Sequence, residues 1–146
     1  MVKKRIMTVG GFLSVMLYSP FATCYATDVV QNPPPKSTVE LYQDIIVSLL
    51  IPLIDKQIEF YYTKEYKYSP HVYPYDVTFL DVKRLQGYRS FKFSLSIRTQ
   101  AVVGPHIDVG LDHMTFEIHG GGRVQLTKFE HVRSYELPPH LQYYKK

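Results

Sequence analysis

One amphipathic segment is followed only by strand-like segments, and this order constrains the fold more than any other feature. Residues 38–64 carry apolar side chains at the 3.6-residue spacing of a helix. Ser37 and Glu40 have the spacing of a capping box, in which each side chain satisfies a backbone amide at a helix start. Because Pro52 lies inside the pattern, we expect one long helix kinked near that residue. The apolar register predicts a buried face made of Tyr42, Ile45, Ile46, Leu49, Leu50, Leu53 and Phe60.

Four strands are expected after the helix, and the first two form a hairpin. Residues 76–85 and 88–98 flank Gln86 and Gly87, a pair suited to a two-residue turn because glycine tolerates positive φ. This turn predicts the facing pairs Val82 with Phe91, Leu80 with Phe93, and Asp81 with Lys92.

The second hairpin has a turn at residues 120–122, which are three glycines. Apolar and polar side chains alternate on both sides of this turn, as in half-buried strands. If His119 pairs with Arg123, the core-facing pairs are Ile118 with Val124 and Phe116 with Leu126.

The element order predicts an α+β fold in which an antiparallel sheet of about four strands curls around one long helix. Cystatin-like and nuclear-transport-factor-like folds share this plan by analogy.

The N-terminus has the order of a secretory signal peptide. Lys3, Lys4 and Arg5 precede an apolar run over residues 6–21, and small residues lead to a cleavage site after Ala26. The run is shorter than the roughly 20 residues that a permanent membrane span needs, so we expect no transmembrane helix in the mature form. The protein is therefore expected to be secreted, with lipid anchoring at Cys24 as the alternative.

Cleavage also changes the composition. Cys24 is the single cysteine, so the mature chain would have no disulfide and would depend on packing alone. Three of the 17 basic residues lie in the signal, which leaves 14 against 13 acidic residues, a net charge of +1. Such a balance gives no electrostatic footprint for nucleic acid.

Four parts follow along the chain. Residues 1–26 are the signal peptide, residues 27–36 a proline-rich leader, residues 37–134 a single α+β domain, and residues 135–146 a flexible tail.

The most promising functional segment joins the two hairpins. Residues 99–111 are expected to form a loop, and long loops are often functional. His106 and Asp108 in this loop, Asp112 beside it, and Tyr88 are the candidate binding residues. The histidine and carboxylates fit no established metal spacing, so we predict no metal site, no cofactor and no catalytic residues.

Tyrosines are densest between the helix and the first strand. Tyr61, Tyr62, Tyr66, Tyr68, Tyr73 and Tyr75 either close the gap between helix and sheet or line an exposed surface that binds a ligand.

Several short motifs carry a family resemblance over residues 38–133. They are Glu40-Leu41-Tyr42-Gln43-Asp44, Pro52 with Ile54-Asp55-Lys56, Tyr61-Tyr62, Gly87-Tyr88-Arg89-Ser90-Phe91, Gly104-Pro105-His106, Gly110-Leu111-Asp112 and Lys128-Phe129. The chain resembles a family of small exported proteins from endospore-forming Gram-positive bacteria that is grouped as a domain of unknown function. The resemblance implies a secreted, uncharacterised domain with no catalytic residues to carry over.

The sequence favours a non-enzymatic extracytoplasmic module that binds a ligand or an envelope partner through residues 99–111 and the neighbouring tyrosines. Two alternatives remain open. One is a metal-assisted hydrolase that uses His106 and Asp112, and the other is a structural or inhibitory protein of the envelope or spore coat.

Overall fold

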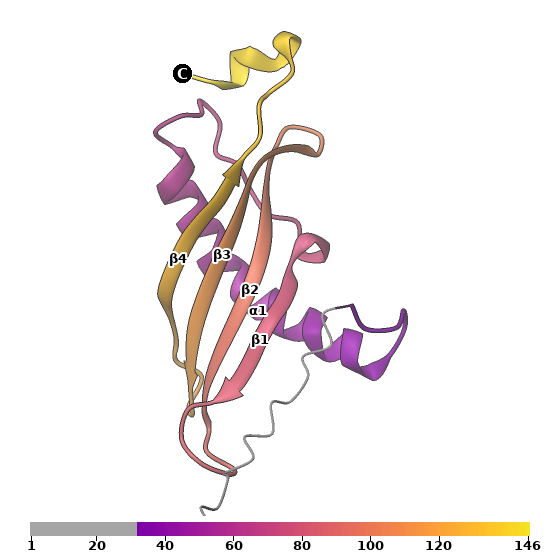
Figure 1. Ribbon diagram of the computed structural model, residues 1–146, viewed down its shortest axis with the longest axis vertical. Helices are drawn as coiled ribbons and strands as arrows, with labels where there is room; N and C mark the ends of the chain where they lie inside the picture. The colour runs from indigo at the N-terminus through magenta and orange to yellow at the C-terminus, as the bar shows by residue number, and fades with distance from the viewer. Residues whose placement is uncertain (1–31) are drawn as a thin grey trace, which may run out of the picture.

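The computed structural model describes residues 32–146, in which one long helix crosses a four-stranded antiparallel sheet (Figure 1). The predicted signal peptide, Cys24 and the start of the predicted leader lie outside the described residues. The elements are α1 (Thr38–Tyr62), η1 (Pro74–Asp76), β1 (Thr78–Arg84), β2 (Lys92–Val103), β3 (Ile107–His119), β4 (Val124–Ser134) and η2 (Pro139–Tyr144). The α+β class is confirmed.

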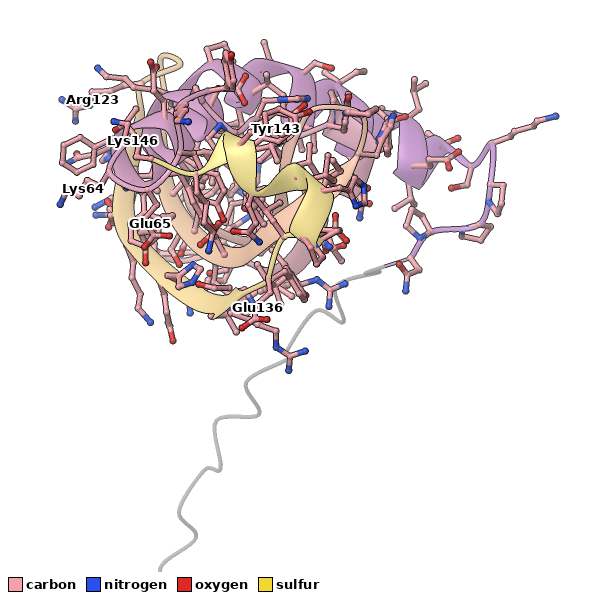
Figure 2. All side chains as sticks on the ribbon, turned by 90° about the horizontal axis from the view of Figure 1, so that it is seen from above. Lys64, Glu65, Arg123, Glu136, Tyr143 and Lys146 are labelled. Carbon is pink, nitrogen blue, oxygen red and sulfur yellow. The ribbon has the colours of Figure 1, made fainter. Side chains whose placement is uncertain are left out.

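The strands follow one another in the sheet in chain order, β1-β2-β3-β4. Figure 1 shows α1 running diagonally behind the sheet, and Figure 2, seen from above, shows the sheet curving around the helix. The core fills the space between these two layers. Because sheet and helix each have one apolar side, this pairing is how both bury it.

The capping box starts α1, with one change from the expected pattern. The Glu40 N–H donates to Ser37 Oγ at 3.1 Å. The Glu40 carboxylate accepts from the Lys36 N–H instead of from Ser37, whose own N–H donates to the Pro34 carbonyl at 3.1 Å. The helix continues through Pro52 and ends at Tyr62, two residues before the expected end. The kink near Pro52 stays a prediction.

The buried face of α1 is not the one predicted. The core residues on the helix are Val47, Leu50, Ile54, Ile58 and Tyr62. Of the predicted face, Leu50 is buried and Ile46 and Leu53 are partly buried, whereas Tyr42, Ile45, Leu49 and Phe60 are exposed. The prediction was wrong because residues 45–54 are almost all apolar, so periodicity cannot fix which side of that segment faces the sheet.

The second hairpin has the predicted register. The His119 N–H donates to the Arg123 carbonyl at 2.8 Å. Ile118 pairs with Val124 and Phe116 with Leu126. Beyond these pairs, the register shifts twice.

The first hairpin has a longer connection than predicted. Val82 pairs with Leu95 instead of Phe91, and Arg84 pairs with Phe93. Asp81 pairs with Ser96, while Lys92 forms an ion pair with Glu117 at 3.0 Å. Residues 85–91 connect the strands, and both Gly87 and Arg89 have positive φ, so the turn is wider than a two-residue turn.

Residues 99–111 are not a loop. Strand β2 extends to Val103 and β3 begins at Ile107, which leaves only residues 104–106 as the connection. Residues 101–103 are buried, so extending the strands adds them to the core. Gly104 and His106 both have positive φ and turn the chain within this short space.

Residues 135–146, expected to be a flexible tail, pack against the segment after α1. The Lys67 N–H donates to the Tyr144 carbonyl at 2.8 Å, and the Lys146 N–H donates to the Glu65 carbonyl at 2.9 Å. Figure 2 shows Glu65, Tyr143 and Lys146 at this end of the molecule. Within residues 32–146, the structure contains no helix with the length and apolar character of a membrane span.

Candidate functional site

A buried carboxylate lies where α1, β3 and β4 meet. The side chain of Asp112 on β3 has no exposed surface. Its Oδ2 accepts a hydrogen bond from Tyr62 Oη on α1 at 2.9 Å. Its Oδ1 lies 2.8 Å from Nδ1 of His131 on β4. Hydrogen bonding from two other elements is what makes burial of this polar group tolerable.

The hydrogen-bonded chain continues outward from His131. Its Nε2 lies 2.8 Å from Ser134 Oγ, and Ser134 is exposed to solvent. With Asp112 ionised, the carboxylate only accepts, so Nδ1 carries the proton and Nε2 accepts from the Ser134 hydroxyl. We call Tyr62, Asp112, His131 and Ser134 the buried-acid cluster.

Two bulges in β4 bring these side chains together. The register shifts between the pairs Thr115–Lys128 and Phe116–Leu126, which leaves Thr127 as an extra residue. This shift places His131, rather than Glu130, opposite Asp112. A second shift leaves Val132 as an extra residue, so Ser134 returns to the same face as His131.

Tight packing holds the tyrosine in place. A Cβ on Gly110 would lie 2.7 Å from the Cζ atom of Tyr62 and closer still to its hydroxyl oxygen. Glycine is therefore required at position 110 for the Tyr62 hydroxyl to reach Asp112. On the other side of the cluster, the Tyr61 ring stacks on the His131 ring with centroids 5.0 Å apart.

Burial dominates the electrostatics of this cluster. It raises the pKa of Asp112, while the hydrogen bonds from His131 and Tyr62 lower it and offset part of the effect. Burial, followed by the charge of Asp112, raises the pKa of Tyr62 well above its ordinary value, so this hydroxyl stays protonated and donates.

A second group of side chains surrounds the turn between β2 and β3. The ring of Tyr73 stacks on the ring of Tyr75, with centroids 5.2 Å apart, and on the ring of His106, with centroids 4.4 Å apart. The Tyr75 and His106 centroids are 6.4 Å apart, so the three stacked rings form a compact triangle. The hydroxyl of Tyr75 lies 3.2 Å from Nδ1 of His106. Tyr75 is 68% exposed, so the outer face of the stack is open to solvent. We call these three residues the aromatic end.

Two carboxylates accompany the aromatic end. The pKa of Asp76 is raised by partial burial and then by the negative charge of Asp108, and the neighbouring His106 opposes this rise. The two acids therefore lie close enough to repel each other beside the stacked rings. This end of the sheet combines flat aromatic surface with negative charge.

The predicted site residues fall in three separate places. His106 and Asp108 lie at the aromatic end, and Asp112 lies in the buried-acid cluster. Tyr88 is 94% exposed in the connection of residues 85–91, at the opposite end of the sheet (Figure 1).

His106 and Asp112 are too far apart to share one metal ion. They are six positions apart along the start of β3, which is about 20 Å in an extended strand. The described part of the chain contains no group of three or more histidine, cysteine or acidic side chains placed to hold a metal. The arrangement therefore lends no support to metal-assisted hydrolysis by this pair.

The tyrosine-rich segment contributes to both the core and the surface. Tyr62 and Tyr66 are buried in the core, whereas Tyr61, Tyr68 and Tyr75 are exposed. A further tyrosine pair, Tyr68 and Tyr144, makes an edge contact with centroids 5.8 Å apart. Some of these tyrosines thus close the gap between helix and sheet, whereas others lie on the surface, where ligand binding stays a prediction.

Sequence reasoning missed His131, Ser134, and the roles of Tyr62 and Gly110. The predicted hairpin register, continued without bulges, would pair Asp112 with Glu130, one residue short of His131. No sequence pattern marked the extra residues Thr127 and Val132. The useful signal was the register itself, which already brought β4 beside Asp112.

Comparison with known proteins adds one finding. A family model described as a protein of unknown function, DUF3888, matches residues 42–133. No curated protein and no solved structure matches the chain. The expected membership of a domain family of unknown function is confirmed.

Proposed function

The chain belongs to the DUF3888 family of unknown function, and we propose that it is an extracytoplasmic module that binds a polypeptide partner through its aromatic end. Export rests on the signal-like order of residues 1–26. One observation carries the binding proposal, namely the exposed stack of Tyr75, Tyr73 and His106 beside Asp76 and Asp108.

Such a surface favours a cationic ligand. The face of a tyrosine ring attracts a guanidinium or ammonium group, with a contribution of about 0.5–1 kcal/mol at exposed sites. Carboxylates beside the rings add charge-assisted hydrogen bonds to the same group. We therefore propose that the partner presents an arginine or lysine next to an apolar or aromatic residue.

The rings are also prepared for binding before a ligand arrives. The Tyr73 ring stacks on both of its neighbours, and the Tyr73 and Tyr75 rings are nearly parallel, with an interplanar angle of 8°. The hydrogen bond between Tyr75 and His106 further restricts the outer ring. Side chains that are already ordered lose less conformational entropy on binding, so the surface gains affinity from this arrangement.

The proposal can be tested by NMR titration with two model peptides. One peptide carries arginine beside tyrosine, and the other replaces each arginine with glutamate. We expect the basic peptide to shift the amide signals of residues 73–76 and 104–108, and the acidic peptide to leave them unchanged. The variants Tyr75→Ala and Asp108→Asn should each weaken the binding of the basic peptide.

Tyr88→Ala is the matched control, because Tyr88 is also an exposed tyrosine but lies at the other end of the sheet. This variant should bind the basic peptide as the unaltered protein does. The proposal is wrong if neither peptide shifts these signals, or if Tyr88→Ala weakens binding as much as Tyr75→Ala.

A further inference from the structure

We propose that Ser134 is a nucleophile that accepts acyl groups from activated esters, with His131 as its general base and Asp112 as the residue that positions His131. The proposal concerns the buried-acid cluster and is independent of binding at the aromatic end. It rests on the order of the hydrogen bonds, on the exposure of each group, and on the bulges that create the arrangement.

The connectivity is that of a serine–histidine–aspartate triad. Ser134 Oγ lies 2.8 Å from His131 Nε2, and Asp112 Oδ1 lies 2.8 Å from His131 Nδ1. In such a triad the imidazole nitrogen nearest the serine takes its proton, and the acid fixes the tautomer and orientation of the imidazole. Triads are recognised by these roles and distances, not by chain order or fold.

Solvent exposure increases along the hydrogen-bonded series from Asp112 through His131 to Ser134, which is the order that a buried acid and an accessible nucleophile require. The Asp112 side chain is fully buried, the His131 side chain is 20% exposed, and Ser134 is open to solvent. The acid is therefore shielded from water while the serine can meet a substrate. The Tyr62 hydroxyl donates a hydrogen bond to the second carboxylate oxygen, Oδ2, and this bond fixes the orientation of Asp112 toward His131.

The bulge at Val132 is the structural device that brings histidine and serine together. Residues three apart on a regular strand point to opposite faces, because side chains alternate. The extra residue restores Ser134 to the face of His131, opposite Gly110. Bulges that re-aim a side chain in this way are common next to active sites.

The proposed step balances without a co-reactant other than water. As Ser134 Oγ attacks the ester carbonyl carbon, its proton passes to His131 Nε2. The bond from that carbon to the leaving oxygen then breaks, and the imidazolium returns the proton to the leaving group. Water, deprotonated by the same nitrogen, later releases the acid and restores the serine.

The substrate class is an uncharged ester of a small or apolar acyl group. The Tyr61 ring covers one side of the imidazole, so an aromatic surface without charge lies next to the proposed base. The proposal assigns no donors to the developing oxyanion, and loss of one such donor in known enzymes lowers kcat by about 10²–10³. We therefore expect slow acylation by activated esters.

The experiment incubates the full chain with p-nitrophenyl acetate and, in parallel, with a fluorophosphonate probe. Intact mass and peptide mapping then locate the adduct. We expect both reagents to modify Ser134, with the fluorophosphonate adduct on Ser134 alone, and the variant Ser134→Ala to abolish that adduct. Ser48→Ala is the matched control, because Ser48 is an exposed serine whose hydroxyl donates only to the Asp44 carbonyl, and it should not change labelling.

Two further variants test the roles of the neighbours. His131→Gln should reduce labelling at least tenfold, with circular dichroism confirming that the variant is folded. In Asp112→Asn, labelling of Ser134 should fall and the NMR signal of the proton on His131 Nδ1 should change, because the carboxylate no longer holds that proton on Nδ1. Loss of stability alone does not change this signal in the folded protein.

A cysteine variant keeps the proposal testable if His131→Gln does not fold. Ser134→Cys should react with iodoacetamide at least tenfold faster than Ser48→Cys, because the adjacent imidazole promotes thiolate formation. Equal rates at the two positions would overturn the proposal. So would the absence of an adduct on Ser134 in the folded protein, or an adduct on His131 in its place.

Discussion

Replacing Gly110 by alanine should disconnect the helix from the buried carboxylate. The new Cβ would lie 2.7 Å from Tyr62 Cζ, with the hydroxyl oxygen closer still, and a gap below 3.0 Å forces a shift. Tyr62 is 2% exposed and packed on all sides, so its ring has no free space to enter. The tyrosine must move away from Asp112.

Two costs combine in this variant. Overpacking of a filled core costs about 1–3 kcal/mol. Loss of a hydrogen bond to a charged group costs about 1.5–3 kcal/mol. Together they lower the free energy of unfolding by about 2.5–6 kcal/mol. At about 4 °C per kcal/mol for a domain of this size, the melting temperature should fall by roughly 10 °C or more.

Urea unfolding of the two proteins measures this difference, with equal m-values as the check that the comparison is valid. Gly120→Ala is the matched control, because its Cβ would meet Phe91 Cβ at 3.4 Å, an ordinary contact. The free energy of unfolding of that variant should stay within about 0.5 kcal/mol of the value for the unaltered protein. If Gly110→Ala also stays within this range, the close packing described for Tyr62 is refuted.

Three other outcomes follow from the structure. Leu50→Ala should lower the free energy of unfolding by about 2–5 kcal/mol, whereas Leu49→Ala should lower it by less than about 0.5 kcal/mol because Leu49 is 73% exposed. Equal decreases in melting temperature for the two variants would contradict the orientation of the helix. Tyr62→Phe should cost about 1.5–3 kcal/mol and Tyr88→Phe almost nothing, measured by urea unfolding; a neutral Tyr62→Phe would mean that the hydroxyl does not bond Asp112. Burial raises the pKa of Asp112 above its unfolded value, so the folded state binds this proton more tightly than the unfolded state does. The free energy of unfolding of the unaltered protein, relative to that of Asp112→Asn, should therefore rise as pH falls from neutral through the raised pKa. Urea unfolding of both proteins across this pH range checks the sign.

The sequence predicted the parts of the fold that local rules determine. The capping residues Ser37 and Glu40 marked the helix start, and the three glycines marked the second hairpin. In that hairpin, the alternation of apolar residues allowed one register only, because a one-residue slip would expose the core face. These predictions were right because the deciding interactions lie close in sequence.

Other features depend on contacts that are distant in sequence. The face of α1 was ambiguous because residues 45–54 present apolar side chains in nearly every direction, and only the sheet selects Leu50 over Leu49. The segment of residues 99–111 contains turn-forming residues, but burial of residues 101–103 extends both strands into it.

The candidate site was half predicted. His106, Asp108 and Asp112 were selected from the sequence, but His131 and Ser134 were not, because their positions depend on the two bulges in β4. Gly110 and Tyr62 meet across α1 and β3, and neither residue alone suggests the contact.

The protonation of the His131 ring tests the central claim most directly, namely that Asp112 holds His131 through Nδ1 and leaves Nε2 for Ser134. Long-range ¹H–¹⁵N NMR of the histidine side chains distinguishes the two ring nitrogens. The account predicts that at neutral pH the neutral ring carries its proton on Nδ1, and that Asp112→Asn changes the signal of that proton. A ring with its proton on Nε2 and a bare Nδ1 would contradict it.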